Sequence, residues 1–254
     1  PPGERLDVVD GMLRGEVGGG RGVTITIRAP EAGESSDVFI EFEVVQVPSI
    51  VWRMLAEEDT FGYVQIIRFT SRTPEELRTA IEDLKSQGAV ALVLDLRGNS
   101  GGLLQESVEV ASEFIDGGVV FYEVRRSGET TTEATPGGAW TEGPLVVLVD
   151  AGTASAAELV AGAIRDHERG ILIGQRTYGK GSVQLIFRLS DGSSVHITSA
   201  EWFTPDRTPL EGNGLEPTIS MIPDESGRDV ELGEAVRQLR ELVGAQVAVP
   251  GLDG

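Results

Sequence analysis

The sequence predicts an α/β fold, in which helices cover a sheet of parallel, buried strands. From residue 61 onward, segments with strand-like and helix-like patterns alternate along the chain, as is typical of α/β proteins. Two strand segments, 89–96 and 144–150, are continuous apolar runs, the pattern of parallel strands buried on both faces. In such folds, functional sites form where strand ends meet helix starts.

The first 48 residues are expected to form a small unit of their own. They hold one helix-like segment followed by two strand-like segments: residues 4–14, 23–29 and 37–47. In the helix-like segment, Leu6, Val9 and Leu13 recur at helical spacing. Pro48 closes the block. A piece of this size buries too little apolar surface to build a good core alone, so we place the main domain at residues 49–254.

The main domain is expected to contain strands and helices in alternation. The expected strands are 61–69, 89–96, 119–126, 144–150 and 170–175, with a hairpin at 182–204. The expected helices are 71–88, 103–116, 156–168 and 229–245. In the first helix, Thr73 is expected at the N-cap, Pro74 at the first helical position and Gly88 at the stop. Residues 127–143 are expected to form a loop.

Composition excludes several function classes. The chain has 41 acidic and 21 basic residues and a net charge of −20, which repels phosphate backbones, so no nucleic-acid partner is expected. It has no cysteine, which excludes disulfides, thiolate zinc sites and cysteine nucleophiles. No apolar run approaches the ~18 residues of a membrane span. The chain opens without methionine, so we expect a mature or trimmed product.

Ser155 is a candidate nucleophile because of its position between a buried strand and a helix. Its small neighbours are Gly152, Ala154, Ala156 and Ala157. These let a substrate backbone come close, and the helix start offers free N–H groups, such as that of Ala156, for a developing oxyanion. The alternative is structural: Thr153 or Ser155 caps the helix, and Glu158 completes a capping box. Position alone leaves both readings open.

A nucleophilic serine needs a base, and the two histidines of the chain are poorly placed for that role. His167 lies twelve residues after Ser155, about 18 Å along a helix, too far to act on it. His196 alternates with polar residues in the expected hairpin. A Ser–His–Asp triad is therefore poorly supported, although the sequence leaves His196 open.

Lys180 is the second candidate base. It lies between two glycines in "TYGKGSVQ", at the entrance to a strand. The glycines allow close packing, so we expect the lysine stem to be buried, and burial makes a lysine amine a better base near neutral pH. Gln184, four residues later, is expected on the same strand face, where its carbonyl can orient the amine. The alternative is a solvated loop lysine.

The segment "LDLRGNSGGLL" (94–104) is the third cluster. A strand end, a glycine pair and a helix start together offer backbone donors, so Gly101 or Gly102 can supply a second oxyanion N–H. Taken alone, the segment also fits a tight turn that an Arg97–Asp95 pair stiffens.

Three separated blocks together resemble the carboxyl-terminal processing peptidases, the tail-specific serine proteases. The blocks are "LVLDLRGNSGGLL", "GTASAAELVAGAIRDHERGILIGQRTYGKGSVQ" and "GNGLEP", and the resemblance covers roughly residues 49–222. Thr153 stands where the family usually has serine, and Ala157 where it often has serine. Tyr178 replaces the usual phenylalanine. None of these differences removes a catalytic group.

The resemblance implies a fold and a set of roles. The core is expected to be the αββ spiral of the Clp protease and crotonase type. Ser155 is implied to be the nucleophile, Lys180 the general base and Gln184 the residue that orients it. Ala156 and Gly101 are implied to donate backbone N–H groups to the oxyanion. The reaction would cleave proteins near an accessible C-terminus through an acyl-enzyme, with no metal or other cofactor.

The family also carries a PDZ domain before the core, and residues 1–48 resemble its second half. The first half, with the loop that binds a terminal carboxylate, is absent from the sequence, so we expect it to have been trimmed away. The resemblance further implies action outside the cytoplasm, in the periplasm, cell envelope or secreted fraction. The expected partners are protein or peptide substrates, and a homo-oligomer stays open.

Two other function classes compete with the peptidase. One is a catalytically silent binding protein on the same fold, which the presence of Ser155, Lys180 and Gln184 argues against. The other is a crotonase-like hydratase or thioesterase. It requires carboxylates near the oxyanion site, for which Glu106 is the obvious candidate.

Overall fold

The computed structural model describes residues 19–28, 35–43, 47–56, 58–224 and 226–247. The chain divides into two compact units, Pro1–Pro48 and Ser49–Gly254. Within the described residues, no helix is both long and apolar enough to cross a membrane.

The first unit contains an antiparallel pair of strands, β1 (Gly22–Arg28) and β2 (Ser35–Glu41). Both strands were expected, although β2 ends earlier than the pattern indicates. Val23 lies opposite Ile40, so apolar side chains at alternate positions share one face of the pair. The helix expected at 4–14 lies outside the described residues, and the PDZ assignment of this unit stays a prediction.

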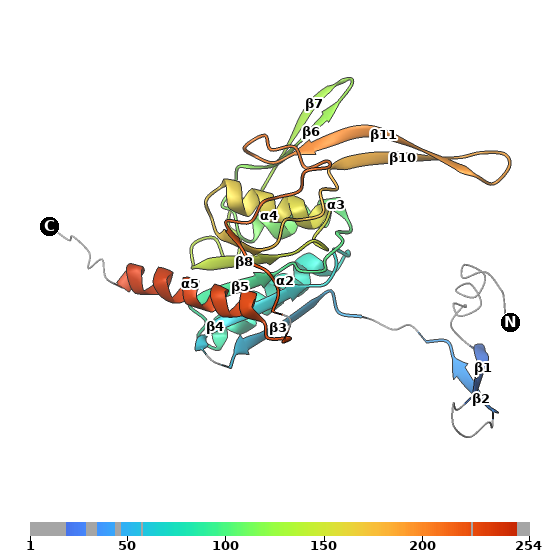
Figure 1. The fold of residues 1–254 in the computed structure, drawn as a ribbon, viewed down its shortest axis with the longest axis horizontal. Coiled ribbons are helices and arrows are strands. Elements are labelled where there is room, and N and C mark those ends of the chain that lie inside the picture. Colours follow the sequence, from blue (N-terminus) through green and yellow to red (C-terminus); the bar gives the residue numbers. More distant parts are fainter. Residues whose placement is uncertain (1–18, 29–34, 44–46, 57, 225, 248–254) are drawn as a thin grey trace. The chain divides into compact units, whose positions relative to one another are not determined.

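The second unit is built on a six-stranded sheet with the strand order β12-β9-β8-β5-β4-β3 (Figure 1). Its strands are β3 (Ile50–Leu55), β4 (Glu58–Ile66), β5 (Ala91–Asp95), β8 (Leu145–Val149), β9 (Ile171–Gly174) and β12 (Ile219–Ser220). The strands from β4 to β12 run parallel, and β3 pairs antiparallel at one edge. β5 and β8, the two apolar runs, are buried along their whole lengths.

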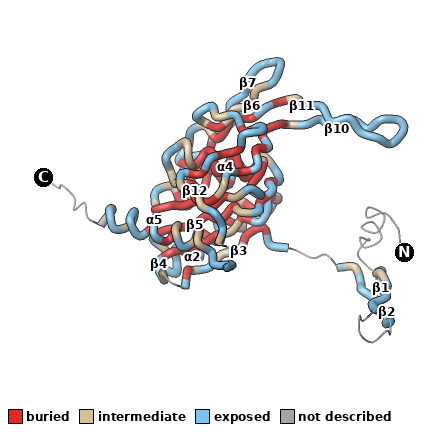
Figure 2. The backbone as a smooth tube through the Cα atoms, viewed as in Figure 1, coloured by how far each residue is buried: buried red, intermediate tan, exposed pale blue. Residues whose placement is uncertain are grey.

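Helices cover both faces of this sheet. They are α2 (Thr73–Ser86), α3 (Leu104–Ser112), α4 (Ala156–Asp166) and α5 (Val230–Val247). One core cluster joins α2, α3 and α4 to one face, and a second joins α5 to the other. Successive residues of β5 alternate between the clusters, since Leu94 packs in the first and Val93 in the second. Figure 2 shows the buried residues gathered in this centre.

A second, four-stranded antiparallel sheet has the order β10-β11-β6-β7. Its strands are β6 (Val119–Arg125), β7 (Gly128–Glu133), β10 (Ser182–Arg188) and β11 (Ser194–Phe203). The β10–β11 hairpin, expected from its pattern, extends away from the rest of the unit (Figure 1).

Three local expectations were wrong. β7 lies inside the expected loop 127–143, because its polar, largely exposed residues carry no apolar alternation. β3 was not expected, since only its two end residues are buried. Thr73 is the first residue of α2 rather than its cap, which is Arg72.

Candidate active site

Two loops meet at the carboxyl edge of the six-stranded sheet. β5 and β8 are parallel neighbours, so the loops that follow them emerge side by side. Hydrogen bonds join the loops: the Gly98 N–H donates to Asp150 Oδ1 (2.8 Å), and the Ala154 N–H donates to the Asn99 carbonyl (2.9 Å). Thr153 Oγ1 also donates to the Leu96 carbonyl at 2.9 Å. The first two sequence motifs therefore form one site.

Ser155 stands in an unusual backbone conformation at the start of α4. It is the N-cap residue, with φ of 58° and ψ of −123°. Residues with a side chain rarely adopt a positive φ, and such strain clusters at functional sites. The side chain is partly exposed. Ser155 is therefore both the N-cap of α4 and a partly exposed residue in a strained backbone conformation.

Glu158 links the serine segment to the lysine segment. Its carboxylate is fully buried. One oxygen, Oε2, accepts the backbone N–H groups of Ser155 (2.8 Å) and Lys180 (2.9 Å). The other, Oε1, accepts the Gly179 N–H (2.7 Å) and the Thr177 hydroxyl. The backbones of Ser155 and Lys180 are therefore held together by a single oxygen atom.

The burial expected for Lys180 was wrong, because its side chain is exposed. The flanking glycines serve a different purpose. A Cβ on Gly179 would lie 2.8 Å from the Gly214 nitrogen, and one on Gly181 would overlap the Glu211 nitrogen. The glycines therefore allow the 210–214 segment to pack against this turn, and they do not bury the lysine stem.

Lys180 and Gln184 line one cleft of about 640 Å³, and Ala154, the residue before Ser155, lines it too, although Ser155 itself is not among the lining residues. The first block contributes Ser100 and the second contributes Gly152, Ala154, Tyr178, Gly179 and Ser182, while Ala151 and Glu211 lie outside the blocks. The strand alternation expected to bring Lys180 and Gln184 to one face does not hold, because β10 begins at Ser182 and has a bulge between Val183 and Gln184. The two side chains share the cleft nonetheless.

Gly101 and Ala156 lie against the serine. A Cβ added to Gly101, whose φ is 97°, would lie 2.9 Å from the Ser155 Cβ and 3.1 Å from the Ala156 nitrogen. Ala156 is the first residue of α4, where backbone N–H groups have no partner within the helix. The Gly101 N–H, in contrast, donates to Asn99 Oδ1 at 2.8 Å. The Gly101 N–H can serve as an oxyanion donor only after its hydrogen bond to Asn99 Oδ1 is broken.

An ion-pair network that sequence reasoning captured only in part supports the first loop. The expected Arg97–Asp95 pair is present, and Arg97 also binds Asp229 (2.8 Å) and Glu231 (2.7 Å) at the start of α5. Burial acts to lower the pKa of Arg97, but its hydrogen bonds to Asp229 and Asp95 outweigh burial and raise it. The hydrogen bond from Arg97 lowers the pKa of Asp229. The network therefore links the start of α5 to Arg97, at the beginning of the loop that follows β5.

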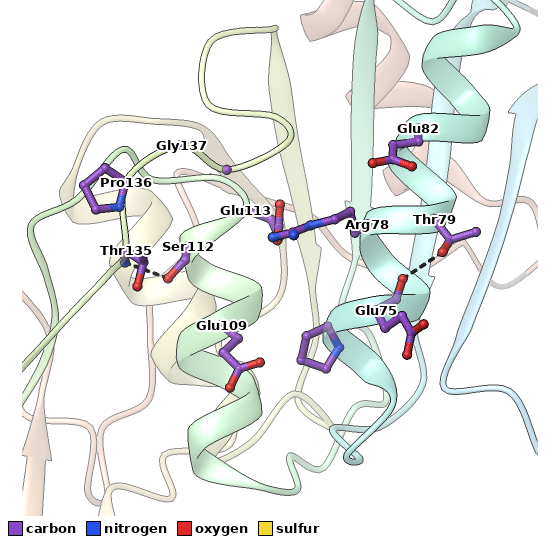
Figure 3. Close-up of a pocket in the computed structure, with 12 residues that line it drawn as sticks. Glu75, Arg78, Thr79, Glu82, Glu109, Ser112, Glu113, Thr135, Pro136 and Gly137 are labelled. Atoms are coloured by element: carbon purple, nitrogen blue, oxygen red, sulfur yellow. Dashed lines mark hydrogen bonds and ion pairs between the residues drawn. The ribbon is translucent and has the colours of Figure 1, made fainter.

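Neither histidine lines the cleft. His167 donates its ring N–H to the Val119 carbonyl at 2.7 Å, and His196 is exposed on β11. Figure 3 shows another hollow, of about 450 Å³, between α2 and α3. There the buried Glu113 pairs with Arg78 and accepts the Ala139 N–H, and the lining contains none of the three sequence blocks that carry the candidate residues. The cleft beside Ser155 is therefore the stronger catalytic candidate.

Residues 60–221 match the family model of peptidase family S41. The chain is 34% identical over 243 residues to a carboxy-terminal-processing protease of Bartonella bacilliformis, across 92% of the chain and 55% of that relative. It is 37% identical over 182 residues to a carboxyl-terminal-processing protease of Synechocystis sp., across 69% and 43%. A solved photosystem II D1 C-terminal processing protease superposes with a TM-score of 0.64 at 32% identity, across 89% and 62%.

The chain spans about half the length of the curated relatives it matches. The α/β core of the Clp protease and crotonase type, expected from the sequence, is confirmed by these likenesses. Because the family model matches more than half of the chain, the chain belongs to peptidase family S41.

Proposed function

We propose that this chain carries the protease core of a serine endopeptidase that uses a Ser–Lys dyad and cleaves proteins near their C-terminus. The observation that carries the proposal is the shared carboxylate of Glu158, which holds the backbones of Ser155 and Lys180 beside one cleft. The names of the relatives, carboxyl-terminal-processing proteases, support the substrate class.

In the proposed mechanism, Ser155 Oγ attacks the scissile carbonyl while the Lys180 amine takes its proton. The amine is exposed in the cleft, where a bound substrate would cover it and exclude water. Gln184 orients the amine through its side-chain carbonyl. Lys180 then gives its proton to the leaving amine, and a water molecule hydrolyses the acyl-enzyme.

The oxyanion is stabilised by two backbone donors in this proposal. Ala156, the first residue of α4, supplies one. Gly101 supplies the other, once its N–H exchanges Asn99 Oδ1 for the substrate oxygen. The reaction requires only proton transfer and backbone donors, so no metal or other cofactor takes part.

The proposal extends to the substrates and their capture. Residues 1–48 form the second half of a PDZ domain in this proposal, which the antiparallel strands β1 and β2 support, and without the carboxylate-binding loop they bind C-terminal peptides weakly. The enzyme acts outside the cytoplasm on protein or peptide substrates, as the family resemblance implies.

The test is hydrolysis of a fluorogenic peptide by three alanine variants. Ser155→Ala and Lys180→Ala should abolish cleavage while circular dichroism shows an intact fold. His196→Ala should retain activity. Equal loss of activity in His196→Ala and Lys180→Ala would show that the base is misassigned, and activity in Ser155→Ala would overturn the proposal itself.

A further inference from the structure

The outer part of the β10–β11 hairpin pairs only within itself in the sheet, because β11 pairs with β6 only from Ala200 onward. Every residue from 184 to 198 is exposed, and Figures 1 and 2 show the hairpin projecting from its unit. A two-stranded ribbon is marginally stable without a partner. The length of this projection therefore suggests a binding role.

One face of the hairpin is apolar. Leu185 lies opposite Ile197, and Phe187 lies opposite Val195, so the four side chains share one face. Each of the four residues is between 40% and 51% exposed. The opposite face holds Gln184, Ile186, Arg188, Ser194, His196 and Thr198 and is mostly polar. Exposed apolar patches of this kind mark interaction sites.

The outer edge of β10 has no second partner strand among the described residues. The Leu189 N–H donates inward to the Ser193 carbonyl at 2.8 Å. Because backbone groups alternate in direction along an antiparallel strand, those of Leu185 and Phe187 also point inward. Those of Gln184, Ile186 and Arg188 then point to the free edge. This edge offers an unfilled row of donors and acceptors.

The free edge begins in the candidate active site, since Gln184 lines the cleft with Lys180. We propose that β10 is an extended substrate-binding strand. An extended segment of the polypeptide substrate pairs with the backbone of Ile186 and Arg188 and lays apolar side chains against Leu185 and Phe187. This mode of binding is β-strand addition, and it rests on the proposed peptidase function.

The size of the apolar face favours a substrate segment over a second copy of the chain. Four side chains that are each about half exposed offer roughly 300 Å², the size of a small surface patch. A stable protein–protein interface buries about 800 Å² on each partner. The free edge of β10 is also continuous with the cleft, so a peptide paired with this edge would extend toward Lys180.

The experiment compares two substitutions at one position of the free edge. Ile186→Pro removes the outward N–H, which the β10–β11 ladder does not use, and proline is tolerated on edge strands. Ile186→Thr keeps the N–H and is the matched control. Phe187→Thr tests the apolar face, with Ile186→Thr again the control from the opposite face. Thermal unfolding verifies that each variant folds.

Each variant is assayed with a short fluorogenic peptide that fills only the cleft and with a longer one that adds an extended Val- and Leu-rich segment. We expect Ile186→Pro and Phe187→Thr to raise KM for the long peptide about 2- to 10-fold, the effect of one lost contact. Neither should change KM for the short peptide, and Ile186→Thr should change neither value.

The outcomes separate this inference from the proposed function. Equal kinetics of all variants on the long peptide, with Ser155-dependent cleavage intact, would refute substrate binding on β10 and leave the peptidase standing. If the unsubstituted chain cleaves neither peptide, the proposed function fails first. If the molecular mass in solution rises with protein concentration, and Phe187→Thr removes this rise, the apolar face binds a second copy of the chain instead.

Discussion

Replacement of Glu158 by glutamine perturbs the site at the point where its two halves join. The buried carboxylate accepts four hydrogen bonds, whose donors are the Ser155, Gly179 and Lys180 N–H groups and the Thr177 hydroxyl. Glutamine has nearly the same shape, but an NH₂ group replaces one acceptor oxygen. With the NH₂ group at the Oε1 position, the Thr177 hydroxyl can rotate to accept from it, and the Gly179 N–H is the one donor left facing a donor. A buried donor without a partner costs about 1–3 kcal/mol, so Glu158→Gln should lower the free energy of unfolding by about 1–3 kcal/mol.

The same change should lower kcat about 10- to 100-fold, because small misplacements of reacting groups are costly. Urea unfolding gives the stability, and peptide hydrolysis gives kcat. Glu106→Gln, at a partly exposed carboxylate on α3, is the control and should stay within about 0.5 kcal/mol. A Glu158→Gln variant as stable and as active as the unsubstituted chain would refute the coupling of Ser155 to Lys180 through this carboxylate.

Three further changes have defined outcomes. Gln184→Ala should lower kcat roughly 2- to 100-fold through loss of one orienting hydrogen bond, with no change in Tm because the side chain is exposed; unchanged kcat would return Gln184 to an ordinary strand residue. Gly101→Ala places a Cβ 2.9 Å from that of the proposed nucleophile and should abolish hydrolysis, whereas Gly98→Ala meets nothing within 4 Å and should cost only about 1–2 kcal/mol of left-handed strain; equal activity of the two variants would contradict the crowding. The Arg97 hydrogen bond lowers the pKa of Asp229, so this carboxylate stabilises the fold above its unfolded pKa of about 3.9 and loses that contribution as pH falls through the lower folded value; acid titration followed by circular dichroism should show a smaller loss in Asp229→Asn, and identical curves would argue against it.

The sequence predicted most elements around the site because local patterns determine them. β5 and β8 are unbroken apolar runs, and α4 follows a turn of small residues, so each was visible without tertiary information. β7 was missed because its residues are polar and pair only with β6. A strand that is held mainly by backbone hydrogen bonds has no characteristic pattern of apolar side chains, so the sequence does not reveal it.

The motif blocks of the candidate site were visible in the sequence, but the hydrogen bonds that join them were not. Glu158 was interpreted only as a capping residue, since its bonds to Gly179 and Lys180 cross more than 20 residues of sequence. The expected burial of Lys180 failed for a related reason. Its flanking glycines leave room for the backbone near Leu210 and Glu211. That this segment packs against the Lys180 turn cannot be predicted from local sequence.

The central claim is that Ser155 is a nucleophile activated by Lys180. A fluorophosphonate probe reacts only with an activated serine, so labelling followed by peptide mass spectrometry tests this claim directly. We predict a single adduct on Ser155 that Lys180→Ala eliminates and that still forms at full rate in His196→Ala. An adduct on another serine, or labelling that survives in Lys180→Ala and disappears in His196→Ala, would contradict it.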